Sequence, residues 1–195
     1  VPCSGDGTMR KNAGPWEKWS CLDALGLHKL QVKIAIRGAD LLAVGGEMIY
    51  STCSLNPVED EAVVAELLRR ADGALQLVDV SDRLPQLRRC SGVPTWHVVR
   101  SDRSGSIVRE WGDFTDLERS RQWESVLPRA DCRDMHLERC LRVMPHHGDT
   151  GGFFVAVLRK ERPIVWREFE SSDERRKRER AAAAANERRA ASGAA

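Results

Sequence analysis

Helical and strand patterns alternate between residues 27 and 80, and this alternation constrains the fold more than any other feature. A first helix is predicted over 27–42 and ends before Gly45-Gly46. Its apolar residues recur at near-helical spacing and are Leu27, Leu30, Ile34 and Leu41. Met48-Ile49-Tyr50 then has the composition of a short buried strand.

A second helix and a second strand follow at once. Asn56 and Pro57 suit the cap and first turn of a helix, and Glu59 completes a capping-box pattern. Residues 75–80 have strand composition, as do residues 153–158 near the end of the chain. The order helix, strand, helix, strand favours a layered α/β sheet.

The rest of the chain divides into an insertion and a tail. Residues 84–141 are rich in Pro, Gly, Trp and charge without a sustained period, as expected of an irregular insertion that carries surface loops. Residues 161–195 are charged and Ala-rich, and large apolar side chains are almost absent from Ser171 onward. We therefore predict a domain over 1–160 and a tail that is disordered or a solvated helix.

Composition limits the class of protein. A chain of 195 residues with 42% hydrophobic residues can bury one core, whereas a net charge of +2 does not by itself indicate a nucleic-acid partner. The six cysteines include no CxxC pair, and no apolar stretch is long enough for a secretion signal or a membrane span, which indicates a reducing, intracellular setting. The chain starts at Val1-Pro2-Cys3 without an initiator Met, so we expect an N-terminally truncated fragment.

Two cysteines occupy positions that suit chemistry. Cys53 ends a predicted strand just before a predicted helix, whose dipole would lower the pKa of the thiol; a small core residue is the competing interpretation. Cys3 lies in Pro2-Cys3-Ser4-Gly5-Asp6-Gly7, where the glycines let the backbone pass close to a ligand, although an ordinary strand-to-loop turn explains the same residues.

Other candidate sites have weaker support. Gly5-Asp6-Gly7 lacks the remainder of a phosphate-binding motif. Cys132, His136 and Cys140 would share one face of a helix, with His146 and His147 downstream, but their spacing is not that of a closed zinc site and we assign no metal. His28 and His97 have no cysteine near them in sequence, so a thiol-protease pair is not indicated.

Two paired motifs resemble a known family. Residues 2–8 are Pro-Cys-Ser-Gly-Asp-Gly-Thr, and residues 50–61 are Tyr-Ser-Thr-Cys-Ser-Leu-Asn-Pro-Val-Glu-Asp-Glu. Together they resemble the Sun family of RNA 5-methylcytosine methyltransferases, and residues 30–38 and 142–154 agree with it. The resemblance covers roughly residues 1–160, and the second motif is most similar to the eukaryotic tRNA-modifying branch.

The resemblance implies a fold and a reaction. The fold would be the C-terminal half of a Rossmann-like class I SAM-dependent methyltransferase domain. Cytosine C5 is a poor nucleophile until a thiolate adds at C6, and by resemblance Cys53 is that thiolate. Cys3 would then help to remove the C5 proton so that the product is released. Arg10, Lys11 and Arg142 are candidate phosphate contacts, with a solvated basic surface as the alternative.

The resemblance also predicts what lies outside this chain. The Gly-rich SAM loop, the acid that would hold the ribose and an Asp are expected N-terminal to Val1, so no cofactor-binding residue is assigned here. We expect the chain alone neither to bind S-adenosyl-L-methionine nor to methylate. The implied partner is RNA, above all tRNA, with no membrane and no obligate protein partner, and the implied location is nuclear, including nucleolar. A noncatalytic RNA-binding relative, and a redox or metal module, are the alternatives.

Overall fold

The computed structural model describes residues 1–100 and 105–167. Its helices and strands are as follows. The helices are α1 Gly14–Lys18, α2 Cys21–Leu41, α3 Glu61–Ala71, α4 Asp116–Arg121 and α5 Pro145–Gly148. The strands are β1 Glu47–Thr52, β2 Leu75–Leu77, β3 Cys90–Ser91, β4 Val98–Val99, β5 Ile107–Val108, β6 Leu141–Val143 and β7 Phe153–Lys160. Short 3-10 turns complete it: η1 Asp6–Thr8, η2 Trp111–Asp113, η3 Glu124–Val126, η4 Ala130–Asp134 and η5 Leu137–Arg139.

The long strand β7 organises the main sheet, which has five strands within the described ranges. It pairs antiparallel with β1 along one edge, from Thr52 opposite Phe154 to Glu47 opposite Arg159. Along its other edge it pairs antiparallel with β6 and then with β2, while β3 extends the sheet beyond β6. Because β1 and β2 are both antiparallel to β7, they run parallel to each other, and α3 connects them.

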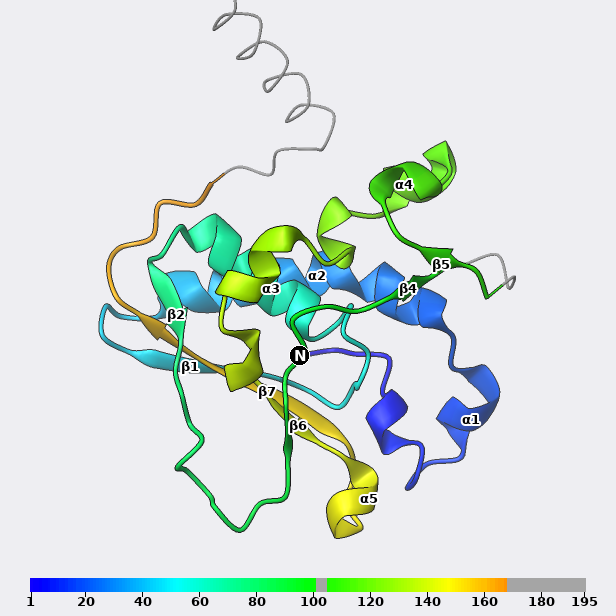
Figure 1. Cartoon of the computed structure of the whole chain (residues 1–195), viewed down its shortest axis with the longest axis horizontal. Helices are drawn as coiled ribbons and strands as arrows, with labels where there is room; N and C mark the ends of the chain where they lie inside the picture. Colours follow the sequence, from blue (N-terminus) through cyan, green and yellow to red (C-terminus); the bar gives the residue numbers. More distant parts are fainter. Residues whose placement is uncertain (101–104, 168–195) are drawn as a thin grey trace, which may run out of the picture.

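Helices α2 and α3 pack against each other and against the sheet, forming a second layer (Figure 1). The α/β prediction is therefore confirmed. One hydrophobic core lies between the helices and the sheet. It includes Val32 of α2, Val63 and Leu67 of α3, and Phe154 and Leu158 of β7. In the part of the chain that the structure describes, no helix is long and apolar enough to cross a membrane.

The first helix begins earlier than the spacing of apolar residues predicted. Helix α2 starts at Cys21 because Ser20 caps it: the Ser20 hydroxyl accepts a hydrogen bond from Leu22 N, and Asp23 accepts one from Ser20 N. The predicted strand at 48–50 is confirmed and longer, whereas the one at 75–80 shortens to Leu75–Leu77.

The second helix begins later than predicted. Residues 57–60 form a turn, and α3 starts at Glu61, eight residues after Cys53 rather than three. The capping box was wrong because the Glu59 carboxylate does not return to the helix end but bonds Ser4 and Ser54. A helix dipole acts within about the first turn, so the argument for its effect on Cys53 loses its basis.

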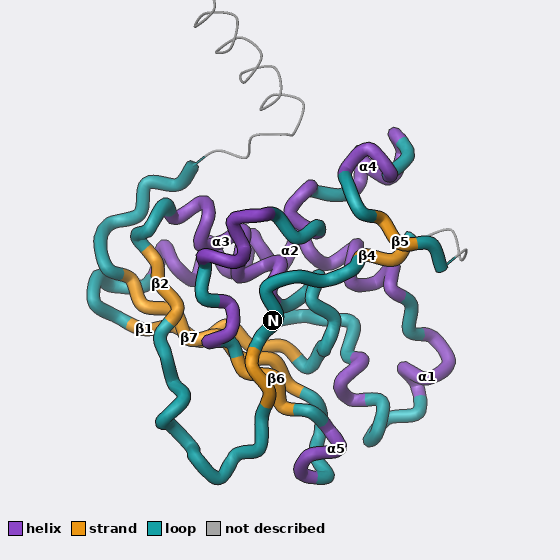
Figure 2. The backbone as a smooth tube through the Cα atoms, viewed as in Figure 1, coloured by secondary structure: helices purple, strands orange, loops and turns teal. Residues whose placement is uncertain are grey.

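The predicted insertion over 84–141 is irregular, as Figure 2 shows by its short strands and helical turns between long loops. It is more than a set of surface loops. Trp96, Val98, Val126 and Leu137 are buried in the same core as the helices. Aromatic and branched side chains of this segment fill part of the core. Their burial was not predicted because the segment has no periodic pattern of apolar residues.

The segment after β7 lies against the domain. Ile164 and Trp166 pack on the core, and Arg167 N donates to Arg70 O at 2.9 Å. Residues 161–167 therefore lie with the folded part, although the sequence placed the start of the tail at 161. The predicted tail over 168–195 lies outside the described residues.

Candidate paired-thiol site

The two cysteines singled out by sequence lie side by side. Cys53 follows β1 directly, and the chain start runs beside the same strand end, where the Val1 amino group donates to Ser51 O at 3.2 Å. The Sγ atoms of Cys3 and Cys53 are 3.0 Å apart, and both residues are half-buried. The fold thus joins two thiols that are fifty positions apart in sequence.

Backbone contacts hold the two cysteine-bearing loops together. Gly7 N donates to Cys53 O at 2.9 Å, and Gly152 N donates to Gly7 O at 2.7 Å. A Cβ on Gly7 would lie 2.5 Å from Cys53 O and 2.8 Å from Gly152 O. Glycine is needed here because three backbone segments meet with no room for a side chain. Asp6 adds a further link by accepting a bond from Leu55 N at 2.9 Å.

The contact between the two sulfurs affects the protonation of Cys3. Burial, and then the hydrogen bond with Cys53, raise the pKa of Cys3 to about 11. At neutral pH Cys3 is therefore a thiol whose proton can be shared with the Cys53 sulfur.

Three consecutive acids behind the site are fully buried, and each bonds a different segment. Glu59 bonds the two cysteine loops, Asp60 accepts from the Thr52 hydroxyl at 2.6 Å, and Glu61 pairs with Arg142. Burial raises the pKa of Asp60 well above its ordinary value. These roles were not predicted, because acids at the start of a helix normally face water. The one signal in the sequence was the unbroken run of three acids at 59–61.

Arg142 is not a phosphate contact, contrary to the sequence-based proposal. It is 8% exposed, its Nε donates to Glu61 at 2.6 Å, and its Nη1 donates to Leu55 O at 2.9 Å. Arg10 and Lys11 are exposed as that proposal requires, and Arg10 forms an ion pair with Asp149. Arg142 serves to fix the chain after Cys53 rather than to meet RNA.

The histidine and cysteine candidates outside the pair do not form a site. Cys132 and Cys140 are buried, but His136 has φ +57° and separates two short 3-10 turns, so the three residues do not share a helix face. Within residues 1–100 and 105–167 no cluster of His, Cys, Asp and Glu could hold a metal. His28 is buried and bonds Val58 O and the Ser125 hydroxyl.

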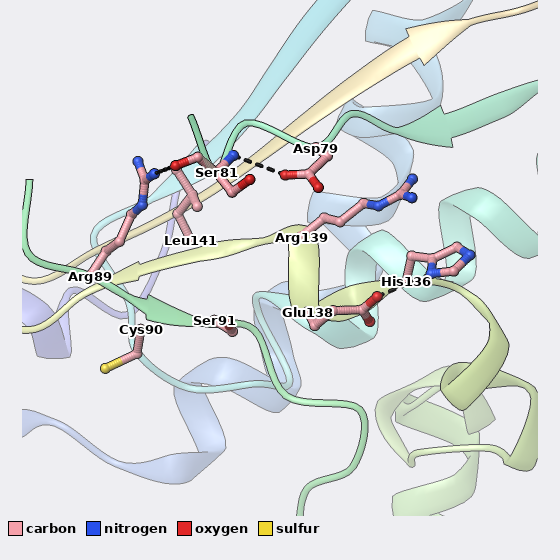
Figure 3. A pocket seen from close by; sticks show the side chains of 9 residues that line it. All are labelled: Asp79, Ser81, Arg89, Cys90, Ser91, His136, Glu138, Arg139 and Leu141. Atoms are coloured by element: carbon pink, nitrogen blue, oxygen red, sulfur yellow. Dashed lines mark hydrogen bonds and ion pairs between the residues drawn. The ribbon is translucent and has the colours of Figure 1, made fainter. Parts of the chain in front are cut away.

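Two surface cavities of about 610 and 420 Å³ lie by the end of β2 and the insertion. Figure 3 shows the larger, lined by Asp79, Ser81, Arg89, Cys90, Ser91, His136, Glu138, Arg139 and Leu141. Its arginines already bond backbone carbonyls: Arg139 donates to Leu77 O at 2.9 Å and Arg89 to Ser81 O at 2.6 Å. Neither cavity borders Cys3 or Cys53, so neither would hold a methyl donor beside the thiols.

Fold and site together define an α/β protein with two facing thiols at the carboxyl end of a sheet strand. A family model described as 16S rRNA methyltransferase RsmB/F matches residues 1–94, which carry both thiols. Residues 1–94 thus match this family, which is the Sun family of the sequence-based prediction.

Similar proteins agree with the predicted branch. Identity is 48% over 172 residues with a multisite-specific tRNA:(cytosine-C(5))-methyltransferase of Schizosaccharomyces pombe, covering 87% of this chain and 25% of that protein. It is 44% over 178 residues with a tRNA (cytosine(34)-C(5))-methyltransferase of Drosophila melanogaster, covering 89% and 23%. A ribosomal RNA small subunit methyltransferase F of Shewanella sp. (strain W3-18-1) matches over 83 residues at 40%, covering 42% and 17%. The chain spans about a quarter of the length of the first two relatives.

Proposed function

We propose that the protein carrying this chain transfers a methyl group to C5 of cytosine in RNA, with tRNA as the substrate class. The observation that carries the proposal is the 3.0 Å approach of the Cys3 and Cys53 sulfurs. The names of the relatives in fungi and fly support the choice of tRNA. A target base inside a helix must first be extruded, which favours loops and unpaired junctions in the RNA.

The two thiols would act in sequence. Cys53 attacks C6, and the bond formed moves electron density onto C5, which then takes the methyl group. Once the Cys53 sulfur is bonded to C6, its hydrogen bond and charge no longer raise the pKa of Cys3. The Cys3 thiol can then give its own proton to solvent more readily. The resulting thiolate acts as the base that helps to remove the C5 proton, the electrons of the C5–H bond form the C5–C6 double bond, and Cys53 leaves as a thiolate, which releases the product.

We propose S-adenosyl-L-methionine as the methyl donor, in keeping with the methyltransferase family. The residues that hold it are proposed to lie outside these 195 residues, and the chain alone is proposed to be inactive. Titration of the isolated chain with the cofactor in a calorimeter tests this, and measurable binding would contradict it. We also propose a nuclear or nucleolar location, which imaging of a fluorescent fusion checks.

The decisive experiment traps the covalent adduct on RNA containing 5-azacytidine. Cys53→Ala in the natural protein should abolish both methyl transfer and the trapped complex, because no sulfur remains to attack C6. Cys3→Ala should accumulate a covalent complex on ordinary RNA, since the adduct forms but resolves slowly. Adduct formation by Cys53→Ala would contradict the assignment, and a wild-type protein that binds RNA without any adduct would be a noncatalytic relative.

A further inference from the structure

We propose that Glu59 is a positioning residue that keeps the two cysteines in register, an inference that rests on the proposed function. Glu59 is fully buried, and its carboxylate reaches the residue that directly follows each cysteine. It accepts a hydrogen bond from the Ser4 hydroxyl at 2.5 Å and one from the Ser54 hydroxyl at 2.7 Å. One side chain therefore bridges the two loops that carry the thiols.

Four donors converge on this carboxylate. Besides the two hydroxyl groups, Glu59 Oε1 accepts from Ser4 N at 2.8 Å and from Gln31 Nε2 at 3.0 Å. The same Gln31 amide donates to Pro2 O at 2.9 Å, so α2 also holds the chain just before Cys3. An ionised carboxylate offers about four acceptor positions, and this network uses all of them.

Neighbouring donors fix the direction of both serine hydroxyls. Trp19 Nε1 donates to Ser4 Oγ at 3.2 Å, and Asn56 N donates to Ser54 Oγ at 3.0 Å. Each hydroxyl accepts from one of these groups and is therefore oriented to give its own proton to Glu59. A glutamine at this position would offer one acceptor oxygen where two are used, leaving donors unpaired in a buried site.

The backbone of Glu59 is anchored independently of its carboxylate. Tyr50 of β1 donates its hydroxyl proton to Glu59 O at 2.6 Å. The side chain therefore extends from a point fixed to the strand that precedes Cys53. Because C5 and C6 are adjacent atoms of one base, both sulfurs must stay within reach of the same small target, and an error of about 1 Å can cost about 10²-fold in rate.

The test uses Glu59→Gln in the natural protein with two readouts. We expect kcat to fall by about 10²-fold while KM for RNA changes little, since Glu59 is fully buried and therefore does not contact RNA itself. We also expect binding of phenylarsine oxide, which needs two sulfurs on one arsenic, to weaken about tenfold because the thiols lose preorganisation. The binding of the arsenical that depends on the thiol pair is the fraction that is lost in Cys3→Ser.

A matched control separates positioning from general stability. Glu66 is also a buried acid, but it pairs with Arg69 and Arg70 of its own helix at 2.7 and 2.8 Å. Glu66→Gln should lower the unfolding midpoint yet leave arsenical binding unchanged. The inference is overturned if Glu59→Gln keeps wild-type arsenical affinity, or if Glu66→Gln weakens it equally. The arsenical measurement needs no RNA, so it decides on positioning even if the protein proves not to be a methyltransferase.

Discussion

Gly7 is the residue at which the smallest possible change should disturb the thiol site most. Gly7→Ala places a Cβ 2.5 Å from Cys53 O, so the loops must separate and the bond from Gly7 N to Cys53 O must lengthen. We expect a loss of about 1–3 kcal/mol in the free energy of unfolding, measured by urea titration, with slower adduct formation.

Gly26 supplies the matched comparison. It lies in α2 with open space around the added Cβ, so Gly26→Ala should stabilise the protein by about 0.5–1 kcal/mol. A Gly7→Ala protein as stable as the wild type would show that the three backbone segments do not constrain one another there.

Among single residues, the two thiols were predictable from the sequence, but the side chains that hold them in place were not. Cys3 and Cys53 were identified through paired motifs whose residues are contiguous. Glu59 was expected at a helix cap and Arg142 on the surface, because a charged side chain normally faces water. Their burial depends on partners 55 and 81 positions away, namely Ser4 and Glu61, which no local pattern contains.

The end of α2 is held by a lysine from β7. Lys160 is 8% exposed, and its Nζ donates to Ala39 O at 2.9 Å and to Leu42 O at 2.8 Å. An ammonium at the carboxyl end of a helix pairs with its unsatisfied carbonyls and its dipole. Lys160→Met should therefore lower the free energy of unfolding by about 1–3 kcal/mol in urea titration.

The adjacent Arg159 provides a control for this substitution. Its ion pair with Glu47 is exposed, so Arg159→Met should change the free energy of unfolding by about 1 kcal/mol or less. Equal losses for the two variants would contradict a capping role for Lys160.

His28 makes the contact of α2 with the insertion sensitive to pH. Its Nδ1 lies 2.7 Å from Val58 O and its Nε2 lies 2.8 Å from the Ser125 hydroxyl, so the neutral ring donates to the first and accepts from the second. Burial lowers the pKa of His28 to about 4, below its ordinary value near 6.5. The folded state thus binds fewer protons than the unfolded state between about pH 4 and 6.5, and stability falls as pH falls through this window.

Between these two pH values, the free energy of unfolding that depends on neutral His28 falls by about 3 kcal/mol. Urea titrations of the wild type and His28→Gln from pH 7 to 4 measure it: the variant should start less stable and lose less as the pH falls. If the free energy of unfolding falls equally with pH in both proteins, the pKa of His28 is not lowered in the folded state.

Among the helices and strands, the type of each element was predictable from the sequence, but its first and last residues were not. Periodic apolar residues identified α2, cap residues identified α3, and strand composition identified β1 and β7. The starts of α2 and α3 depended on which polar side chains cap a helix and which bond elsewhere. Ser20 and Asp23 do cap, whereas Glu59 serves the thiol loops, and that choice is made by tertiary contacts.

For the molecule as a whole, the segment after β7 ties the sheet side of the domain back to its helices. Trp166 packs on the core, and its Nε1 donates to Asp40 Oδ1 at 2.7 Å. Trp166→Ala should lower the thermal midpoint, since about 1–3 kcal/mol of packing and hydrogen bonding is lost from a partly buried ring. The neighbouring Val165 is 80% exposed, so Val165→Ala should leave the midpoint unchanged, and a similar shift in both variants would contradict this role.

The position of β7 also has a consequence for synthesis of the protein. The strand to which β1, β2 and β6 all bond is the last of them to be translated, and Glu47 meets its partner Arg159 across 112 positions. Such distant pairing slows folding, and the nascent chain must carry its apolar strand segments without this partner until residue 160 has left the ribosome. Stalled or prematurely terminated translation before that point should therefore yield aggregation-prone chains that depend on chaperones.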